Sequence, residues 1–208
     1  MDQVQLPERN FYDDNAASYC EATLKVDMGV ARERFLSKLQ PDAHILDAGC
    51  GSGRDMLAFT MRGFQVTGFD SSPQMAAYAS SYSGRICEVL RFQDMQFQNE
   101  FDGIWSCAAL LHVPKHEMED VMNRLVNSLK PNGVAYFSFI EGEGERVSSD
   151  GRRYNSYTFD SLRALLYKVG RVREVEVWTS TDSGTQSKPA PWLNMIVQKS
   201  SLEGANDI

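Results

Sequence analysis

The feature that most constrains the fold is a glycine-rich turn between a short apolar segment and a segment that favours a helix. The apolar run 45–48 contains one acid, Asp47, and is followed directly by Gly49, Gly51 and Gly53. Glycines at the end of a strand allow a tight turn and a close approach of the backbone to a ligand. The start of the next helix adds N–H groups that lack partners within the helix. The turn therefore predicts a ligand site at the carboxyl end of a strand.

Strand-like and helix-like segments follow one another along most of the chain. An N-terminal helical cap is expected over residues 1–40. The segments expected after it lie at 45–48, 55–61, 65–69, 73–81, 86–90, 101–107, 117–129 and 134–140. This pattern is typical of βαβ units with a parallel sheet that is covered on both faces. Because ligands bind such sheets at the carboxyl ends of the strands, residues 41–140 are predicted to form a cofactor-binding core.

The last third of the chain is predicted to be organised differently. Residues 141–157 are rich in Gly, Ser and charged side chains, which predicts a mobile loop. The remaining expected segments are a helix at 159–169 and strands at 172–179 and 192–198, all within 158–199, and a polar tail at 200–208. Two strands without a helix between them should pair antiparallel. The length of 208 residues suits a single domain of this kind.

Composition excludes several classes of function. The formal net charge is −7, so an extended nucleic-acid surface, which needs clustered Lys and Arg, is not expected. Cys20, Cys50, Cys87 and Cys107 form no C-x-x-C pair, which argues against a disulfide framework and a zinc site. No apolar run reaches the ~18 residues that a membrane span requires, and the N-terminus does not resemble a secretory signal. We therefore expect a cytoplasmic protein without a membrane contact or a bound metal.

Acidic residues lie at or just after the ends of the first three expected strands. Asp47 precedes the glycines, Asp70 ends the second strand about 20 residues later, and Asp94 follows the third strand beside Met95. A carboxylate beside the turn disfavours a pyrophosphate and favours a ligand with an ammonium group. The spacing G-x-G-x-G also differs from the dinucleotide pattern G-x-G-x-x-G. These features favour S-adenosylmethionine, which carries an amino group and a sulfonium but no phosphate, over the cofactor of a nucleotide-linked oxidoreductase.

The same residues resemble motif I of the class I S-adenosylmethionine-dependent methyltransferases, and the resemblance covers about residues 11–199. Further matching segments are 68–72, 101–106 and 129–133, and the closing strand pair resembles the reversed hairpin of that family. The chain is most similar to small bacterial methyltransferases of the tellurite-resistance and small-molecule type. The resemblance implies an α/β, Rossmann-like, doubly wound and mostly parallel sheet of seven strands with a C-terminal antiparallel hairpin.

The resemblance also implies a set of cofactor-binding residues, with S-adenosylhomocysteine as the product. They are Tyr12, Tyr19, Asp47, Gly49, Gly51, Asp70, Ser71, Met75, Asp94, Met95, Cys107 and Ala108. In the family pattern Asp47 holds the methionine part, Asp70 the ribose, and Asp94 with Met95 the adenine. The alternatives are structural roles: helix caps for Asp47 and Asp70, a turn for Asp94, and core packing for the two tyrosines.

His112 is the candidate catalytic residue. It follows the fourth strand, near the expected sulfonium, and an imidazole can accept a proton near neutral pH. Its alternative role is to order the turn that follows it. Arg152, Arg153 and Tyr154 in the expected loop, together with Trp192 at the start of the last strand, are candidate residues for binding the acceptor. Their alternatives are a solvated loop and a tryptophan of the core.

The predicted function is transfer of a methyl group to a small-molecule acceptor by in-line displacement. The alternatives are a methyltransferase that acts on RNA or protein, and a protein that binds S-adenosylmethionine without catalysis. Both a monomer and a homodimer are compatible with the sequence.

Overall fold

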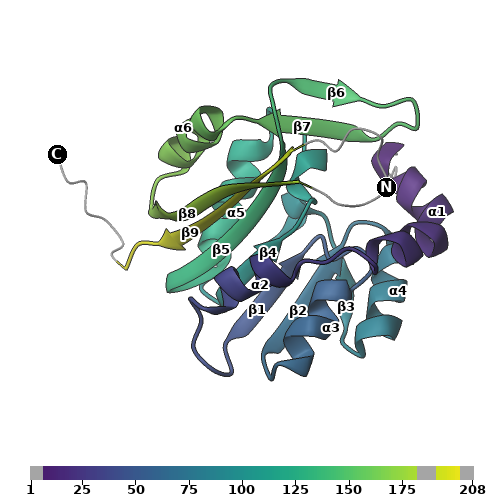
Figure 1. Ribbon diagram of the computed structural model, residues 1–208, viewed down its shortest axis with the longest axis horizontal. Coiled ribbons are helices and arrows are strands. Elements are labelled where there is room, and N and C mark those ends of the chain that lie inside the picture. The colour runs from purple at the N-terminus through teal and green to yellow at the C-terminus, as the bar shows by residue number, and fades with distance from the viewer. Residues whose placement is uncertain (1–6, 182–190, 202–208) are drawn as a thin grey trace.

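Helices cover both faces of one central sheet in the computed structural model, which describes residues 7–181 and 191–201 (Figure 1). The helices are α1 (Pro7–Thr23), α2 (Gly29–Leu36), α3 (Arg54–Met61), α4 (Pro73–Ser83), α5 (Met118–Ser128) and α6 (Phe159–Val169), with short 3-10 helices η1 (Phe92–Asp94) and η2 (Leu110–His112). The strands are β1 (His44–Ala48), β2 (Gln65–Asp70), β3 (Cys87–Val89), β4 (Phe101–Ser106), β5 (Leu129–Glu141), β6 (Glu145–Val147), β7 (Arg153–Tyr157), β8 (Val172–Thr181) and β9 (Pro191–Lys199).

The order of the strands confirms the predicted doubly wound sheet. From one edge the order is β3-β2-β1-β4-β5, and all of these neighbours are parallel. β9 pairs antiparallel with β5, from Val134↔Gln198 to Ile140↔Trp192, and β8 pairs antiparallel with β9. The reversed C-terminal hairpin is therefore present. The parallel arrangement brings the carboxyl ends of β1, β2, β4 and β5 to the same edge of the sheet.

The segment 141–157 corrects a prediction, because it contains two strands where a loop was expected. β6 and β7 pair antiparallel, with Arg146 opposite Tyr154, and the end of β7 pairs with the end of β5. The sheet therefore has nine strands instead of seven. Asn155 and Tyr157 explain the difference, since these alternate residues of β7 are buried. Tyr157 packs on an aromatic ring of β5, with ring centroids 4.8 Å apart.

The two larger hydrophobic clusters lie on opposite faces of the sheet. One contains buried side chains of α5 and α6 together with those of β4, β5 and β9. In the other, Phe35 of α2 and Phe59 of α3 pack around Trp105 and Tyr136, whose rings stack with centroids 4.0 Å apart. The neighbours Ile104 and Trp105 belong to different clusters, as the alternation of side chains along a strand requires.

Helix α1 lies beside α4 near the edge where the parallel strands end (Figure 1). The Cys20 thiol lies 3.6 Å from the sulfur of Met75 on α4. The Ser72 hydroxyl, at the start of α4, donates to the Asp13 carboxylate at 2.5 Å. These contacts hold the helical cap over the sheet edge. Within residues 7–181 and 191–201, no helix has the length and apolar character needed to cross a bilayer.

Candidate active site

A cavity of about 900 Å³ opens at the carboxyl ends of β1, β2, β4 and β5. A cavity of this size accommodates a ligand of the dimensions of a cofactor together with a small molecule. It brings together most of the residues predicted for the site: Tyr12, Tyr19, Asp47, Gly49, Gly51, Asp70, Ser71, Met75, Cys107, Ala108, His112, Arg152, Tyr154 and Trp192. The position agrees with the rule that open α/β sheets bind ligands at this edge.

The glycine turn leaves backbone exposed to the cavity. Gly49 has a φ of +76°, and a Cβ at this position would lie 2.5 Å from the Cβ of Ala109. Only glycine therefore fits there. Gly51 has a φ of +54°, and no atom lies within 4 Å of the position that its Cβ would occupy. The backbone N–H of Gly49 donates to the carbonyl of Phe69 at 3.0 Å, which fixes the turn to the end of β2.

Asp70 connects the glycine turn to the start of α4. Its carboxylate accepts hydrogen bonds from the backbone N–H groups of Gly51 and Ser72, each at 3.0 Å. The N-cap of α4 is Ser72, whose hydroxyl accepts from the N–H of Met75 at 3.1 Å. Ser72, and not Asp70, is therefore the residue that caps this helix. Burial raises the pKa of Asp70 although these N–H groups lower it.

Asp47 has the least favourable surroundings of the acids on the cavity wall. Its side chain is 2% exposed, and one carboxylate oxygen, Oδ2, has no hydrogen-bond partner among the described residues. Burial raises the pKa of Asp47 well above its usual range, and the nearby carboxylate of Asp55 raises it further. An unpartnered carboxylate that faces a cavity fits a ligand with a positively charged group.

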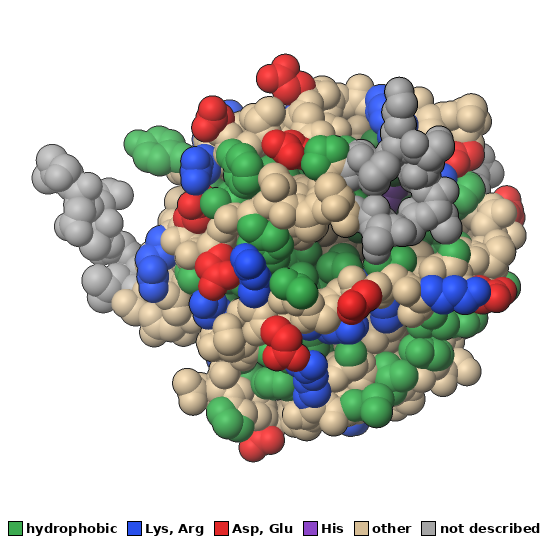
Figure 2. All heavy atoms as spheres, in the orientation of Figure 1, with side chains coloured by type: hydrophobic (Ala, Val, Ile, Leu, Met, Phe, Trp, Pro, Cys, Tyr) green, Lys and Arg blue, Asp and Glu red, His purple; other side chains and the backbone are tan. Residues whose placement is uncertain are grey.

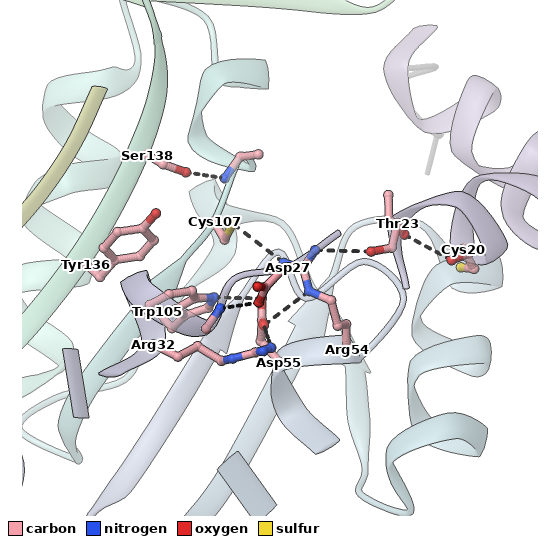
Figure 3. Close-up of polar contacts among 12 residues, drawn as sticks. Cys20, Thr23, Asp27, Arg32, Arg54, Asp55, Trp105, Cys107, Tyr136 and Ser138 are labelled. Atoms are coloured by element: carbon pink, nitrogen blue, oxygen red, sulfur yellow. Dashed lines mark hydrogen bonds and ion pairs between the residues drawn. The ribbon is translucent and has the colours of Figure 1, made fainter. Parts of the chain in front are cut away.

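The sequence did not identify the charged network around Asp55 (Figure 3). The carboxylate of Asp55 accepts from Arg32 at 2.8 Å, from Arg54 at 2.7 Å and from the indole N–H of Trp105 at 3.0 Å. Arg54 also donates to the backbone carbonyl of Thr23, at the end of α1, at 3.2 Å. The ion pair of Arg54 and Asp55 therefore joins α1, α3 and β4. The only signal for Arg54 and Asp55 in the sequence was that they directly follow the last glycine of the turn.

The sulfonium end predicted for the cavity contains Cys107 and Ala108. A guanidinium nitrogen of Arg54 lies 3.8 Å from the Cys107 sulfur (Figure 3). Burial raises the pKa of the Cys107 thiol to about 12, so the thiol is neutral at physiological pH. Ala108 has a φ of +53°, and its N–H donates to the Ser138 hydroxyl at 2.8 Å.

His112 is fully engaged by hydrogen bonds. Its Nδ1 lies 2.6 Å from the carbonyl oxygen of Arg153, which can only accept, so Nδ1 carries the proton. The Tyr12 hydroxyl then donates to Nε2 at 2.7 Å. Burial lowers the pKa of His112 to about 4, so the ring is neutral near pH 7. His112 therefore connects η2 to β7 and to α1, and it lines the cavity.

The predicted aromatic residues of α1 line the cavity. Tyr12 and Tyr19 meet edge to face with ring centroids 5.0 Å apart, and Tyr12 meets His112 in the same way at 5.5 Å. Burial raises the pKa of both tyrosines, so both hydroxyls keep their protons. Their rings form a wall between the cavity and solvent rather than part of either hydrophobic cluster.

The β6–β7 hairpin contributes Arg152 and Tyr154 to the cavity. The Arg152 guanidinium lies over the ring of Phe11 at 3.9 Å and over Tyr154 at 5.5 Å, and it binds the Asp150 carboxylate through two nitrogens. Arg153 does not line the cavity, and its guanidinium pairs with Glu145. Trp192 lines the cavity from the start of β9, as predicted for the acceptor side.

Asp94 and Met95 are not among the residues that line the cavity. Asp94 ends η1 and forms an ion pair with Arg91 at 2.6 Å, which agrees with the turn role, and the Met95 side chain is buried in the core. The cavity wall at this strand end consists instead of Leu90, Arg91, Phe92 and Gln93. An adenine contact by Asp94 and Met95 stays a prediction.

Residues 45–133 match a family model described as a methyltransferase domain. Over these residues the chain is similar to a methyltransferase domain, and its fold is that of the class I S-adenosylmethionine-dependent methyltransferases. The matched residues include the glycine turn, Asp70 and the first four strands of the sheet. The cofactor of the methyltransferase domain is S-adenosylmethionine, and the unpartnered acid and open glycine turn of this chain fit it.

The chain matches parts of several curated methyltransferases. The chain is 33% identical to 24-methylenesterol C-methyltransferase 3 of Arabidopsis thaliana over 128 residues, which are 57% of this chain and 35% of that protein. It is 27% identical to an uncharacterized methyltransferase of Staphylococcus carnosus over 139 residues, which are 65% of this chain and 67% of that protein. The chain thus spans about a third of the length of the first relative and about two thirds of the second.

Solved structures share the fold over nearly the whole chain. One is the 1,6-didemethyltoxoflavin-N1-methyltransferase of Burkholderia thailandensis, with bound 1,6-didemethyltoxoflavin and S-adenosylhomocysteine. It matches with a TM-score of 0.79 at 21% identity and covers 96% of this chain and 92% of that chain. At this level of identity the likeness establishes the fold of the methyltransferase domain.

Proposed function

We propose that the chain transfers a methyl group from S-adenosylmethionine to a small-molecule acceptor by in-line displacement. The observation that carries the proposal is the Asp47 carboxylate, which is buried at the cavity wall with one oxygen that lacks a partner among the described residues. A cationic ligand satisfies this oxygen, whereas a phosphate would be repelled. The narrower likeness to tellurite-resistance methyltransferases stays a prediction.

The residues that hold the cofactor divide by the part they bind. Asp47 binds the ammonium group, the glycine turn passes along the methionine part, and Asp70 accepts from the ribose hydroxyls through lone pairs that its backbone bonds leave free. Ser71 and Met75 lie beside the adenine. When bound, S-adenosylmethionine supplies an electrophilic methyl group, so the protein acts mainly by alignment and exclusion of water.

The residues around the acceptor have separate roles. Tyr12 and Tyr19 close the cavity against water, and Arg152, Tyr154 and Trp192 orient the acceptor. We assign His112 the role of proton acceptor when the nucleophile is protonated. Its Nε2 lone pair already receives the Tyr12 hydroxyl, so a hydroxyl or amine of the acceptor would replace that hydroxyl and pass its proton to Nε2.

Charge distribution supports a small acceptor over a nucleic acid. Lys and Arg are interspersed with Asp and Glu on the face shown in Figure 2, and no continuous basic patch appears among the described residues there. Phosphate backbones require such patches. The net charge of −7 favours the same conclusion. A methyltransferase for RNA or protein therefore ranks second.

The experiment that tests the cofactor proposal is calorimetric titration of the purified protein with S-adenosylhomocysteine and, separately, with NADH. We expect binding of S-adenosylhomocysteine and none of NADH. Preference for NADH would overturn the proposal, because the unpartnered acid would then face a pyrophosphate.

A second experiment separates catalysis from binding alone. A panel of small acceptors is incubated with methyl-labelled S-adenosylmethionine, and products are detected by mass spectrometry. Labelled acceptor together with S-adenosylhomocysteine supports the transfer. Tight cofactor binding with no methylated acceptor in the panel, in RNA or in protein would favour a non-catalytic binding protein instead.

A further inference from the structure

We infer that the methyl acceptor carries a carboxylate and that Arg146 on the β6–β7 hairpin binds it. This inference rests on the proposed function, because it names the class of acceptor for the same cavity. Arg146 was not among the residues singled out as acceptor ligands from the sequence. It lies on β6, opposite Tyr154 of β7, and lines the cavity.

The acids on the cavity wall lie outside the β6–β7 hairpin, and the arginines that line the wall there, Arg34, Arg54 and Arg91, are each paired with a carboxylate. The acids on the wall are Asp27, Asp47, Asp55 and Asp70, which lie between α1 and the end of β2. The hairpin adds only cationic and neutral side chains to the wall, including Arg146, Arg152 and Tyr154. The part of the wall that carries the acids thus suits the cationic cofactor, and the hairpin suits an anion.

Arg152 and Arg146 differ in what they already bind. Arg152 is committed to the Asp150 carboxylate through two nitrogens. Arg146 forms no ion pair or hydrogen bond with any residue in the described ranges, and its contact is the face of the Tyr154 ring, at 4.3 Å. The Tyr154 hydroxyl likewise has no hydrogen-bond partner in that part of the chain. Two neighbouring donors on the cavity wall therefore have no acceptor among the residues that the structure describes.

The surroundings hold Arg146 in place without neutralising it. The preceding residue, Glu145, accepts from the backbone N–H of Lys115 at 2.9 Å and pairs with Arg153. These bonds fix β6 against β7 and against the segment that follows η2, so the backbone that carries Arg146 is held in place. The Tyr154 ring supports one face of the guanidinium and leaves its edge free.

A carboxylate fits these donors better than a neutral group does. The guanidinium edge offers two parallel N–H groups that match the two oxygens of a carboxylate, and the Tyr154 hydroxyl adds a third donor. A neutral amide would satisfy fewer of these donors and gain no charge attraction. A cation would be repelled by both arginines.

The test uses acceptors offered as matched pairs, each a small carboxylic acid and its primary amide, with labelled S-adenosylmethionine as donor. We expect the acid of a methylated pair to show a kcat/KM at least about tenfold above that of its amide, the difference that one charged hydrogen bond contributes. Arg146→Gln should remove this preference and leave the KM for S-adenosylmethionine within about twofold. Arg146→Lys should restore part of it, since the charge returns without the fork.

Arg163→Gln is the matched control. Arg163 is an exposed arginine of α6 that pairs with Glu174 at 2.8 Å and does not line the cavity. A faster reaction with the amides, or an unchanged preference in Arg146→Gln, would overturn the inference while leaving methyl transfer itself supported. No methylation of any pair, with S-adenosylhomocysteine still bound, would count against both the inference and the proposed function.

Discussion

At the scale of single residues, the cavity wall holds a carboxylate in surroundings that disfavour its charge. Asp47 is buried, one of its oxygens lacks a partner among the described residues, and the carboxylates of Asp55 and Asp70 add repulsion. Such a group destabilises the folded chain unless a cation binds beside it. The position is therefore explained by ligand binding rather than by stability.

Asp47→Asn should weaken binding of S-adenosylhomocysteine at least about tenfold, because the amide keeps the shape of the side chain and loses the attraction for the ammonium group. The melting temperature of the free protein should rise, since a buried charge is removed. Calorimetry and thermal unfolding measure the two effects. Asp42→Asn is the control, because Asp42 is exposed and outside the cavity. An unchanged dissociation constant would remove Asp47 from the site.

His112 should make the stability depend on pH. Burial lowers its pKa from 6.5 to about 4 in the folded chain, so the unfolded chain takes up the proton first as the pH falls. The penalty on the folded state is absent above pH 6.5 and grows to at most about 3 kcal/mol as the pH falls to about 4.

Urea unfolding at pH 7 and pH 4.5 measures this dependence. The wild type should lose more free energy of unfolding between the two values than His112→Gln does. His116→Gln serves as control, because His116 is exposed, and it should behave like the wild type. Equal losses for the wild type and His112→Gln would show that the ring is not buried as neutral imidazole.

At the scale of elements, the cofactor end is closed by an ion-pair network rather than by apolar packing alone. Arg54 spans from Asp55 on α3 to the carbonyl of Thr23 at the end of α1 (Figure 3). Asp55 is buried and is also bonded by Trp105 and Arg32. The placement of α1 over the cavity thus depends on a side chain that directly follows the glycine turn.

Arg54→Gln should destabilise the protein by about 2–4 kcal/mol, because it leaves the buried Asp55 with one cation fewer. Hydrogen exchange should accelerate in the last turn of α1 and less in α5. Arg62→Gln is the control, since Arg62 pairs with Glu33 at the surface. Uniform acceleration of exchange in α1 and α5 would show a global loss of stability instead of a local opening.

The elements differ in how well the sequence predicted them. The glycine turn, the strand ends at Asp47 and Asp70, and the reversed hairpin were predicted because spacing and polarity determine them locally. The β6–β7 hairpin was missed, since Tyr157 is its only fully buried apolar side chain and just two residue pairs join it to β5. The roles of Arg54 and Asp55 were missed because their partners are distant in the sequence and come from α1, α2 and β4.

At the scale of the whole molecule, ligand binding should appear as global stability. S-adenosylhomocysteine at 100 times its Kd should add about 2.7 kcal/mol, if it binds only the folded chain. For a chain of this length the melting temperature should then rise by roughly 5–10 °C. NADH at the same concentration should leave it unchanged. A rise with NADH alone would contradict the assignment of the cofactor end.

The sheet forks at the end of β5. Along most of its length β5 borders β9, and its last two residues border β7, so that Ile140 pairs with both strands. The β6–β7 hairpin, which carries Arg146, Arg152 and Tyr154, lies between β5 and α6 in the sequence. It therefore follows the strands that carry Asp47 and Asp70. Replacement of this hairpin by one of another sequence would thus change which acceptor the cavity binds and leave the cofactor-binding strands intact.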